Sequence, residues 1–275
     1  MKKILVATDL SNASKPALRL AIQLSSLNGY RLTFFHSYHI LRPTSWSDIA
    51  FVSFEKSEST KITRKLRSFV NNVYKSMGIE MPAAVCIATP GLYPDKEIMK
   101  YASTFNYEII CVGRKGSGKT ANLFGSMTTR LIQKPEIPVL IVPEKYRRAS
   151  ISNIIYLSDL VDVENELKEV TAFADPLNAK VELLHFEDKY TEDASWLNSA
   201  KDNVKKLKVK AHYEQFDYSK RTIEIINEFV KRKKCSMLIM FTFKKRNMFE
   251  KIFMPSVSAD FASTVSVPML VLKQY

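Results

Sequence analysis

Short apolar runs alternate with longer segments of helical periodicity along the first half of the chain. The run KILVAT (3–8) precedes SKPALRLAIQLSSL (14–27), where apolar residues recur every three or four positions, and RLTFFHSY (31–38) follows as a second apolar run. The segment 53–77 again carries one apolar face at the helical spacing. Apolar runs interleaved with helices are typical of a parallel sheet that helices cover on both faces.

The remaining elements of the first half continue this alternation. Ser14 stands just before the first helical segment, where its side chain is expected to act as the N-cap. Further strands and helices are expected at 83–88, 94–105, 107–112, 126–134 and 138–143. Five strands linked through helices predict one doubly wound layer.

Residues 152–188 repeat the pattern of residues 2–38. Both segments begin with an apolar run that ends in an aspartate, Asp9 or Asp159, and continue through a helical segment into a second apolar run. Self-similarity at this period indicates a duplicated domain rather than a solenoid of short repeats.

We therefore expect two domains, at 1–145 and 151–275, joined by the polar, basic segment EKYRRAS (144–150). The second domain repeats the order of the first, with elements expected at 180–186, 208–214, 222–233, 236–241 and 268–273. The predicted fold class is α/β, with two tandem doubly wound five-stranded parallel sheets of Rossmann-like type.

Composition and cysteine usage indicate the size of the core and the compartment of the protein. Of 275 residues, 46 % are apolar, which is enough for sizeable cores. The three cysteines form no C-x-x-C pair, and Cys86 and Cys111 lie in apolar runs typical of buried thiols, so a reducing compartment is expected. The start MKKILVATD does not resemble a signal peptide, and no run approaches the ~20 apolar residues of a membrane helix. These features predict a soluble cytoplasmic protein.

The net charge of +13 is unevenly distributed. Residues 1–149 hold 22 Lys and Arg against 10 Asp and Glu, whereas residues 150–275 hold 19 against 18. A basic half can attract nucleic acid, acidic lipid or a phosphorylated small ligand, although a solvated lysine-rich surface is the favoured explanation. The basic clusters with aromatic neighbours are better explained as linker and helix end, so nucleic-acid binding is not expected.

The segment GRKGSGKT (113–120) fits the phosphate-loop pattern G-x-x-x-x-G-K-[ST]. A P-loop nucleotidase is disfavoured, because the match follows the fourth strand instead of the first and Gly125 interrupts the helix expected after Lys119. In doubly wound sheets, ligands bind beyond the carboxyl ends of the strands, where the strand order reverses. If the first and fourth strands are neighbours, this loop and ATDLS (7–11) flank that crevice. Its glycines would then expose N–H groups to phosphates.

These segments together resemble the universal stress protein family. ATDLS and the stretch VGRKGSGKTANLFGSMTTRLIQKPEIPVLIVP are similar to its nucleotide-binding members, which carry a G-x2-G-x9-G-[ST] loop after the fourth strand. Gly113 and Gly116 match the start of that motif and Gly125 its end, but only eight residues separate the last two. The shorter spacing displaces the loop, or Gly118 absorbs the difference. The resemblance covers both halves and implies a tandem universal stress protein.

The resemblance also implies a site for ATP or another adenine nucleotide such as AMP or cyclic AMP, with or without Mg²⁺. Asp9 suits ribose hydroxyls, base edges or, as the less favoured alternative, a metal. Ser37 would stand near the base, and Lys119 offers a point charge to the phosphates. Carried over position by position, the site comprises Ala7, Thr8, Asp9, Ser37, Val112, Gly113, Gly116, Lys119, Gly125, Ser126 and Met127.

The second half departs further from the family pattern. Its equivalent stretch, residues 240–258, contains no glycine, and Pro255 stands where the first half has Gly125. This half is expected to bind no nucleotide and to serve as a pairing partner, since family domains commonly pair through their last strands. A homodimer and an unidentified protein partner remain open.

Catalytic residues are sparse. His36 and His185 end equivalent apolar runs and are expected to be structural, no histidine or cysteine spacing indicates a metal site, and Lys119 alone would support a slow ATPase. Two functions therefore stay open: a nucleotide-binding stress or signalling module, which is favoured, and a protein-interaction module of the same fold without a nucleotide.

Overall fold

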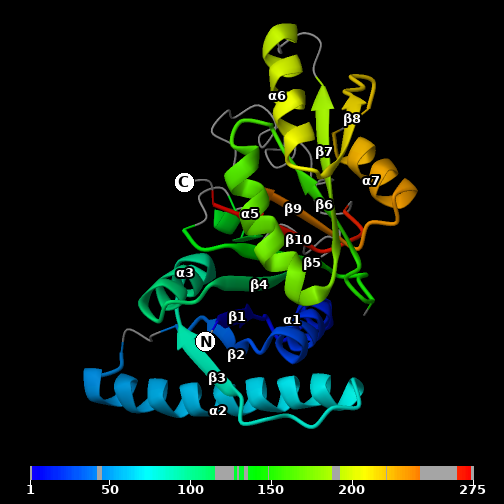
Figure 1. Cartoon of the computed structure of the whole chain (residues 1–275). Coiled ribbons are helices and arrows are strands. Elements are labelled where there is room, and N and C mark those ends of the chain that lie inside the picture. Colours follow the sequence, from blue (N-terminus) through cyan, green and yellow to red (C-terminus); the bar gives the residue numbers. More distant parts are fainter. Residues whose placement is uncertain are drawn as a thin grey trace.

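The computed structural model of the chain is a three-layered α/β assembly, with helices on both faces of one continuous sheet (Figure 1). It describes residues 2–41, 45–114, 127–128, 130–132, 136–147, 149–187, 193–220, 222–241 and 265–273.

Ten strands form the sheet, in the order β3-β2-β1-β4-β5-β10-β9-β6-β7-β8. The first five and the last five follow mirrored orders, so each half is one doubly wound unit. The strands are β1 (Lys3–Ala7), β2 (Arg31–Tyr38), β3 (Val85–Pro90), β4 (Ile109–Arg114), β5 (Val139–Pro143), β6 (Asn153–Leu157), β7 (Lys180–Glu187), β8 (Lys210–Gln215), β9 (Met237–Phe241) and β10 (Met269–Leu272).

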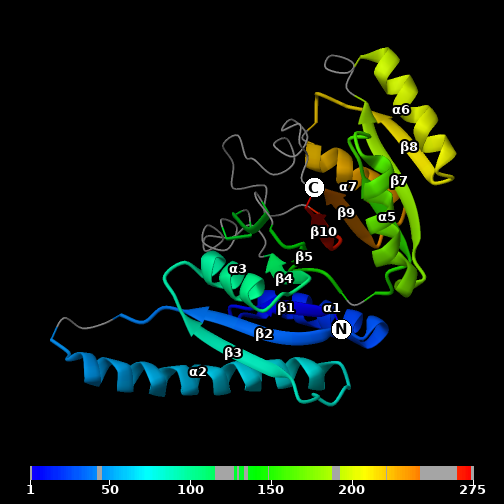
Figure 2. The same cartoon turned by 60° about the vertical axis from the view of Figure 1, so that its left-hand side comes forward.

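Helices cover both faces of this sheet (Figures 1 and 2). The described helices are α1 (Lys15–Asn28), α2 (Asp48–Ser76), α3 (Pro94–Thr104), α5 (Val163–Ala174), α6 (Ala194–Lys206) and α7 (Thr222–Arg232), with 3₁₀ turns η1 (Asn12–Ser14) and η2 (Asp175–Leu177). Residues 127–128 and 130–132 are also helical. Alternate side chains of β1 enter opposite cores, Ile4 and Val6 beneath α1 and α2, and Leu5 and Ala7 beneath α3. Both cores run through the two halves of the chain.

The two halves meet at an antiparallel seam between β5 and β10. Leu270 pairs with Leu140 at its centre, and both side chains are fully buried. The strands within each half are parallel. Both last strands follow a proline in the same way, because the carbonyls of Pro138 and Pro268 accept equivalent hydrogen bonds from the neighbouring strands. The predicted α/β fold of two doubly wound halves is confirmed.

Some local predictions require correction. Ser14 precedes α1, but its side chain makes no capping hydrogen bond, because η1 turns the hydroxyl back toward β1. The second helix begins at Asp48, five residues before the predicted segment, and α6 was not predicted at all. Only Ala200 and Val204 of α6 are buried.

No helix in the described part of the chain combines the length and the apolar character needed to cross a membrane.

The cysteines are free thiols; Cys111 is buried as expected, whereas Cys86 is only half-buried.

Candidate functional site

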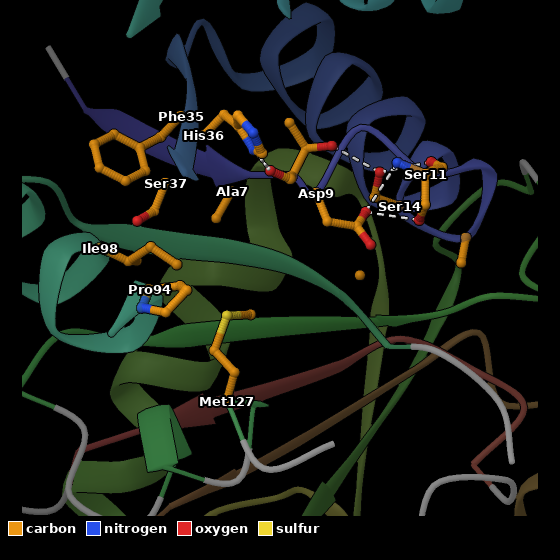
Figure 3. Close-up of a pocket in the computed structure, with 13 residues that line it drawn as sticks. Ala7, Asp9, Ser11, Ser14, Phe35, His36, Ser37, Pro94, Ile98 and Met127 are labelled. Atoms are coloured by element: carbon orange, nitrogen blue, oxygen red, sulfur yellow. Dashed lines mark hydrogen bonds between the residues drawn. The ribbon is translucent and has the colours of Figure 1, made fainter. Parts of the chain in front are cut away.

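A pocket opens at the point in the first half where the strand order reverses. β1 lies between β2 and β4, so the adjacency of the first and fourth strands on which the predicted crevice depended is present. The pocket encloses about 580 Å³ of empty space, a volume that includes its opening to solvent. Its lining comes from the carboxyl ends of β1, β2 and β4 and from the start of α3 (Figure 3).

A tight turn after β1 fixes the aspartate at the mouth of this pocket. Leu10 has a left-handed backbone with φ of 63°, which lets its N–H return to Thr8 Oγ1 at 3.0 Å. Asp9 Oδ1 accepts hydrogen bonds from the backbone N–H of Ser11 at 3.0 Å and from its hydroxyl at 2.7 Å. The second oxygen of the carboxylate points into the pocket (Figure 3). One oxygen therefore holds the side chain in place while the other is open to the pocket.

Two neighbours brace this turn from below. The Ser14 hydroxyl donates to the carbonyl of Ser11 at 2.9 Å, and Thr8 Oγ1 lies 2.7 Å from Ser14 Oγ. His36 Nδ1 lies 2.8 Å from the carbonyl oxygen of Thr8. Because a carbonyl oxygen only accepts, this nitrogen carries the proton. The histidine pins the turn to β2, in line with its predicted structural role.

The opposite wall of the pocket is largely apolar. Phe35, Ile98 and Met127 are buried side chains that line it, and Ser37 adds one hydroxyl. The Ser37 oxygen is buried and has no hydrogen-bond partner within the described part of the chain. Leaving such a group unpaired costs about 1–3 kcal/mol, so a ligand that hydrogen-bonds to it would recover that energy.

An ion pair holds this wall together. Asp95, in the first turn of α3, accepts hydrogen bonds from Arg130 Nε at 2.7 Å and Nη2 at 2.9 Å. Burial alone would raise the pKa of the Asp95 carboxyl, but the hydrogen bonds and charge of Arg130 outweigh it and lower that pKa. The pair joins the start of α3 to the helical residues that include Met127.

Gly113 marks where β4 reaches the pocket. A Cβ at this position would lie 3.0 Å from the Cα of Ser14 and 3.2 Å from the carbonyl oxygen of Ala13. Glycine is therefore needed for close packing of β4 against η1. The sequence had suggested a different reason, namely close approach of the backbone to phosphates.

The second half reproduces the same turn after β6. Leu160 has φ of 64°, and its N–H donates to Ser158 Oγ at 3.0 Å. Asp159 Oδ1 accepts from the N–H of Val161 at 3.0 Å, and His185 Nδ1 lies 2.9 Å from the carbonyl oxygen of Ser158. The backbone geometry of the aspartate turn is thus common to both halves.

The support beneath the second turn is different. The hydroxyl of Tyr156 lies 2.9 Å from Ser158 Oγ and also hydrogen-bonds to Glu166, and all three side chains are buried. Burial and the nearby carboxylate raise the pKa of the Tyr156 phenol, so it stays neutral. The phenol of Tyr156 makes the hydrogen bond to Ser158 that Ser14 makes to Thr8 in the first half, although it comes from the strand and not from the turn after it.

The structure assembles part of the predicted site. Six predicted residues line the pocket: Ala7, Thr8, Asp9, Ser37, Gly113 and Met127. Val112 is fully buried in the core beside Ala7 and is not part of the lining. The other four, Gly116, Lys119, Gly125 and Ser126, lie outside the described residues.

Sequence reasoning missed seven lining residues, which are Ser11, Ala13, Ser14, Phe35, His36, Pro94 and Ile98. His36 and Phe35 directly precede Ser37 in the same strand, so their position at a strand end was the available signal. Among the described residues, no three His, Cys, Asp or Glu side chains come together as metal ligands.

This architecture defines a class: doubly wound α/β proteins whose ligand crevice lies at the switch point of a parallel sheet. The chain belongs to the universal stress protein family, whose model matches residues 1–143.

Relatives agree with this assignment. Universal stress protein MJ0577 of Methanocaldococcus jannaschii is 24 % identical over 159 residues, which cover 52 % of this chain and 96 % of the relative. The crystal structure of a universal stress protein from Archaeoglobus fulgidus covers 98 % of both chains at 18 % identity and a TM-score of 0.69, which shows the same fold along the whole length. A universal stress protein solved in complex with cAMP covers 51 % of this chain and 96 % of its own, at 19 % identity and a TM-score of 0.37.

Proposed function

We propose that the first half binds ATP or a related adenine nucleotide in the switch-point pocket, and that the protein acts as a ligand-dependent stress-response or signalling module. The carboxylate of Asp9 carries this proposal, because one oxygen is anchored to Ser11 and the other faces the pocket. Paired hydroxyls of a ribose are suitable donors to such an oxygen. The apolar wall with its single hydroxyl, Ser37, suits the face and the polar edge of a base.

The phosphates of the nucleotide would lie toward Gly113, where the glycine-containing segment leaves β4. The excess of basic residues in the first half favours an anionic ligand over a neutral one. We place Gly116, Lys119, Gly125 and Ser126 in the phosphate subsite on sequence grounds, with Mg²⁺ as an optional companion of the phosphates.

We further propose that the second half binds no nucleotide and acts as the pairing partner of the first. Its segment after β9 lacks glycine in the sequence, so Cβ atoms would occupy the space that phosphates need. The seam of β5 with β10 would then take the place of pairing between two separate chains. The division into domains at 1–145 and 151–275, and a cytoplasmic location, stay predictions from the sequence.

Calorimetry on the full chain, stripped of nucleotide, tests this proposal, and the internal repeat supplies a matched control. We expect one ATP per chain for the unmodified protein. Asp9→Asn should weaken binding about 10- to 100-fold, because a hydrogen bond to a charged group contributes about 1.5–3 kcal/mol. Asp159→Asn changes the equivalent turn of the second half and should leave the affinity unchanged.

The outcomes separate the alternatives. Equal losses in the two variants, or two ATP per chain, would contradict a site confined to the first half. Absence of binding at millimolar ATP, AMP and cyclic AMP would favour the protein-interaction module. Circular dichroism of each variant verifies that the fold is intact, and titrations with and without Mg²⁺ show whether the ion contributes.

A further inference from the structure

Matching hydrogen bonds align the switch points of the two halves residue by residue. After β1 the N–H of Thr8 donates to the carbonyl oxygen of Phe35 at 2.9 Å, and after β6 the N–H of Ser158 donates to that of Leu184 at 3.0 Å. The residue after each of these carbonyls is a histidine whose Nδ1 contacts the same turn in both halves. Each residue that lines the first pocket from these strand ends therefore has one defined counterpart in the second half.

Phe186 is the counterpart of Ser37, because each directly follows the histidine of its strand. Ser37 lines the pocket of the first half (Figure 3). The pairing of β2 with β1 has the same register as that of β7 with β6, so Phe186 points to the same face of the sheet as Ser37. Phe186 is 2 % exposed and belongs to the same core as Leu184. A buried phenyl ring therefore lies where the first half has a small side chain at its pocket.

A second ring packs against Phe186. The N–H of Phe216 donates to the carbonyl oxygen of Glu187 at 2.9 Å, just as the N–H of Gly91 donates to that of Tyr38 at 2.8 Å, so Phe216 is the counterpart of Gly91. The rings of Phe186 and Phe216 meet edge to face, with centroids 6.4 Å apart and an angle of 90° between their planes. Aromatic pairs in this arrangement are attractive beyond the burial of their surfaces, so the second ring holds Phe186 in place.

Two more lining positions carry larger side chains in the second half. Leu157 is the counterpart of Ala7 and is 2 % exposed. The ladder of β1 with β4 has the same register as that of β6 with β9, so Phe241 is the counterpart of Gly113. Phe241 is 1 % exposed, and its ring packs edge-on against Tyr156 with centroids 6.1 Å apart. The second switch point is thus filled at three positions that are small in the first.

We propose that Phe186, held by Phe216, is a built-in plug that closes the ligand pocket of the second half, and that the small side chain of Ser37 is what keeps the first pocket open to a ring. The inference rests on the proposed function, because that function places the base beside Ser37. Protein interiors are closely packed, so a base and the ring of Phe186 cannot share one space. The plug also indicates the chemistry of this part of the site, which accepts a flat aromatic ring against an apolar wall.

Thiol labelling of matched cysteine variants tests the plug without any nucleotide. Ala7→Cys and Leu157→Cys place a thiol at equivalent strand ends, in a Cys86→Ser background because Cys86 is a half-buried native thiol. Ala7→Cys lines the open pocket and should react with iodoacetamide about 10-fold faster than Leu157→Cys. Adding Phe186→Ala to Leu157→Cys should remove this difference, with Phe186→Val as the milder replacement if the alanine variant does not fold. Equal rates for the two single thiols, or a Leu157→Cys thiol that stays slow after Phe186 is truncated, would overturn the proposal.

Transfer of the plug to the first half tests whether Ser37 controls entry. In calorimetry Ser37→Phe should weaken ATP binding about 100-fold or more, because the ring fills the space of the base. Ser37→Ala is the matched control, since it keeps the space, loses only the hydroxyl and should weaken binding about 10-fold at most. Circular dichroism verifies that each variant is folded.

The two experiments separate failure of the plug from failure of the proposed function. If the unmodified chain binds ATP and Ser37→Phe binds it equally well, the inference fails and the proposed function stands. If the unmodified chain binds no adenine nucleotide, the proposed function fails, and the labelling rates still decide whether Phe186 closes the second half.

Discussion

Glu182 offers a quantitative test of the electrostatics in the second half. This buried carboxylate on β7 is hydrogen-bonded by Lys180 at 2.6 Å and by His212 at 2.6 Å, and Lys210 lies 3.6 Å away. Burial by itself raises the pKa of the carboxyl, but these three neighbours outweigh burial and lower the pKa to about 2. Replacement of Glu182 by Gln removes the charge and keeps the shape of the side chain.

The lowered pKa of Glu182 determines how much the carboxylate stabilises the folded state. A fall from the ordinary value of 4.5 to about 2 corresponds to about 3 kcal/mol of stabilisation of the folded state. Because the folded pKa is the lower one, this contribution is complete above pH 4.5 and is lost as the pH falls toward 2. The free energy of unfolding of Glu182→Gln should therefore be about 3 kcal/mol lower than that of the unmodified protein at pH 7. This difference should shrink steadily below pH 4.5.

Urea unfolding followed by far-UV circular dichroism at pH 7 and at pH 3 measures this difference. Glu164→Gln is the control, because Glu164 forms an ion pair with Lys168 in which both side chains are about two-thirds exposed. Such surface pairs contribute about 0–1 kcal/mol, so the control should stay close to the unmodified protein at both pH values. A Glu182→Gln penalty that is below 1 kcal/mol at pH 7, or is equally large at pH 3, would refute the reasoning.

Two further predictions concern the seam and the strand end at the pocket. Leu270→Ala removes a fully buried side chain from the seam and should lower the free energy of unfolding by about 2–5 kcal/mol in urea titrations; a loss below 1 kcal/mol would mean that the seam contributes little. Gly113→Ala places a Cβ 3.0 Å from the backbone before α1, so we expect a loss of about 1–3 kcal/mol in thermal unfolding. An unchanged melting temperature for this variant would show that η1 can move aside without cost.

The sequence was sufficient for the sheet and its switch point, because alternating apolar runs and helical periods report directly on which faces are buried. The duplication was visible because Asp9 and Asp159 end equivalent strands. The hydrogen bonds that support the aspartate turn could not be predicted from such patterns. Ser14 resembles an ordinary helix N-cap, and only the left-handed backbone at Leu10 with the intervening 3₁₀ turn directs its hydroxyl toward Thr8.

The apolar wall of the site also could not be predicted from the sequence. Pro94 and Ile98 belong to no motif, and they reach the pocket because α3 begins beside the carboxyl end of the sheet. The first turn of α2, from Asp48, was missed for a related reason. Residues 48–52 have apolar positions at helical spacing, but their exposure follows from where β2 and β3 end, which the pattern of the helix itself does not encode.

The fused seam has a consequence for how such a protein can evolve. When two identical chains pair, each substitution appears twice, so a change that fills one pocket fills both. Here β5 and β10 belong to one polypeptide, and residues on either side of the seam can vary separately. The turn beneath Asp159 already shows this freedom, since Tyr156 makes there the hydrogen bond that Ser14 makes in the other half. A single gene can thus encode an asymmetric pair, with selection for ligand recognition acting on one half and selection for folding acting on the other.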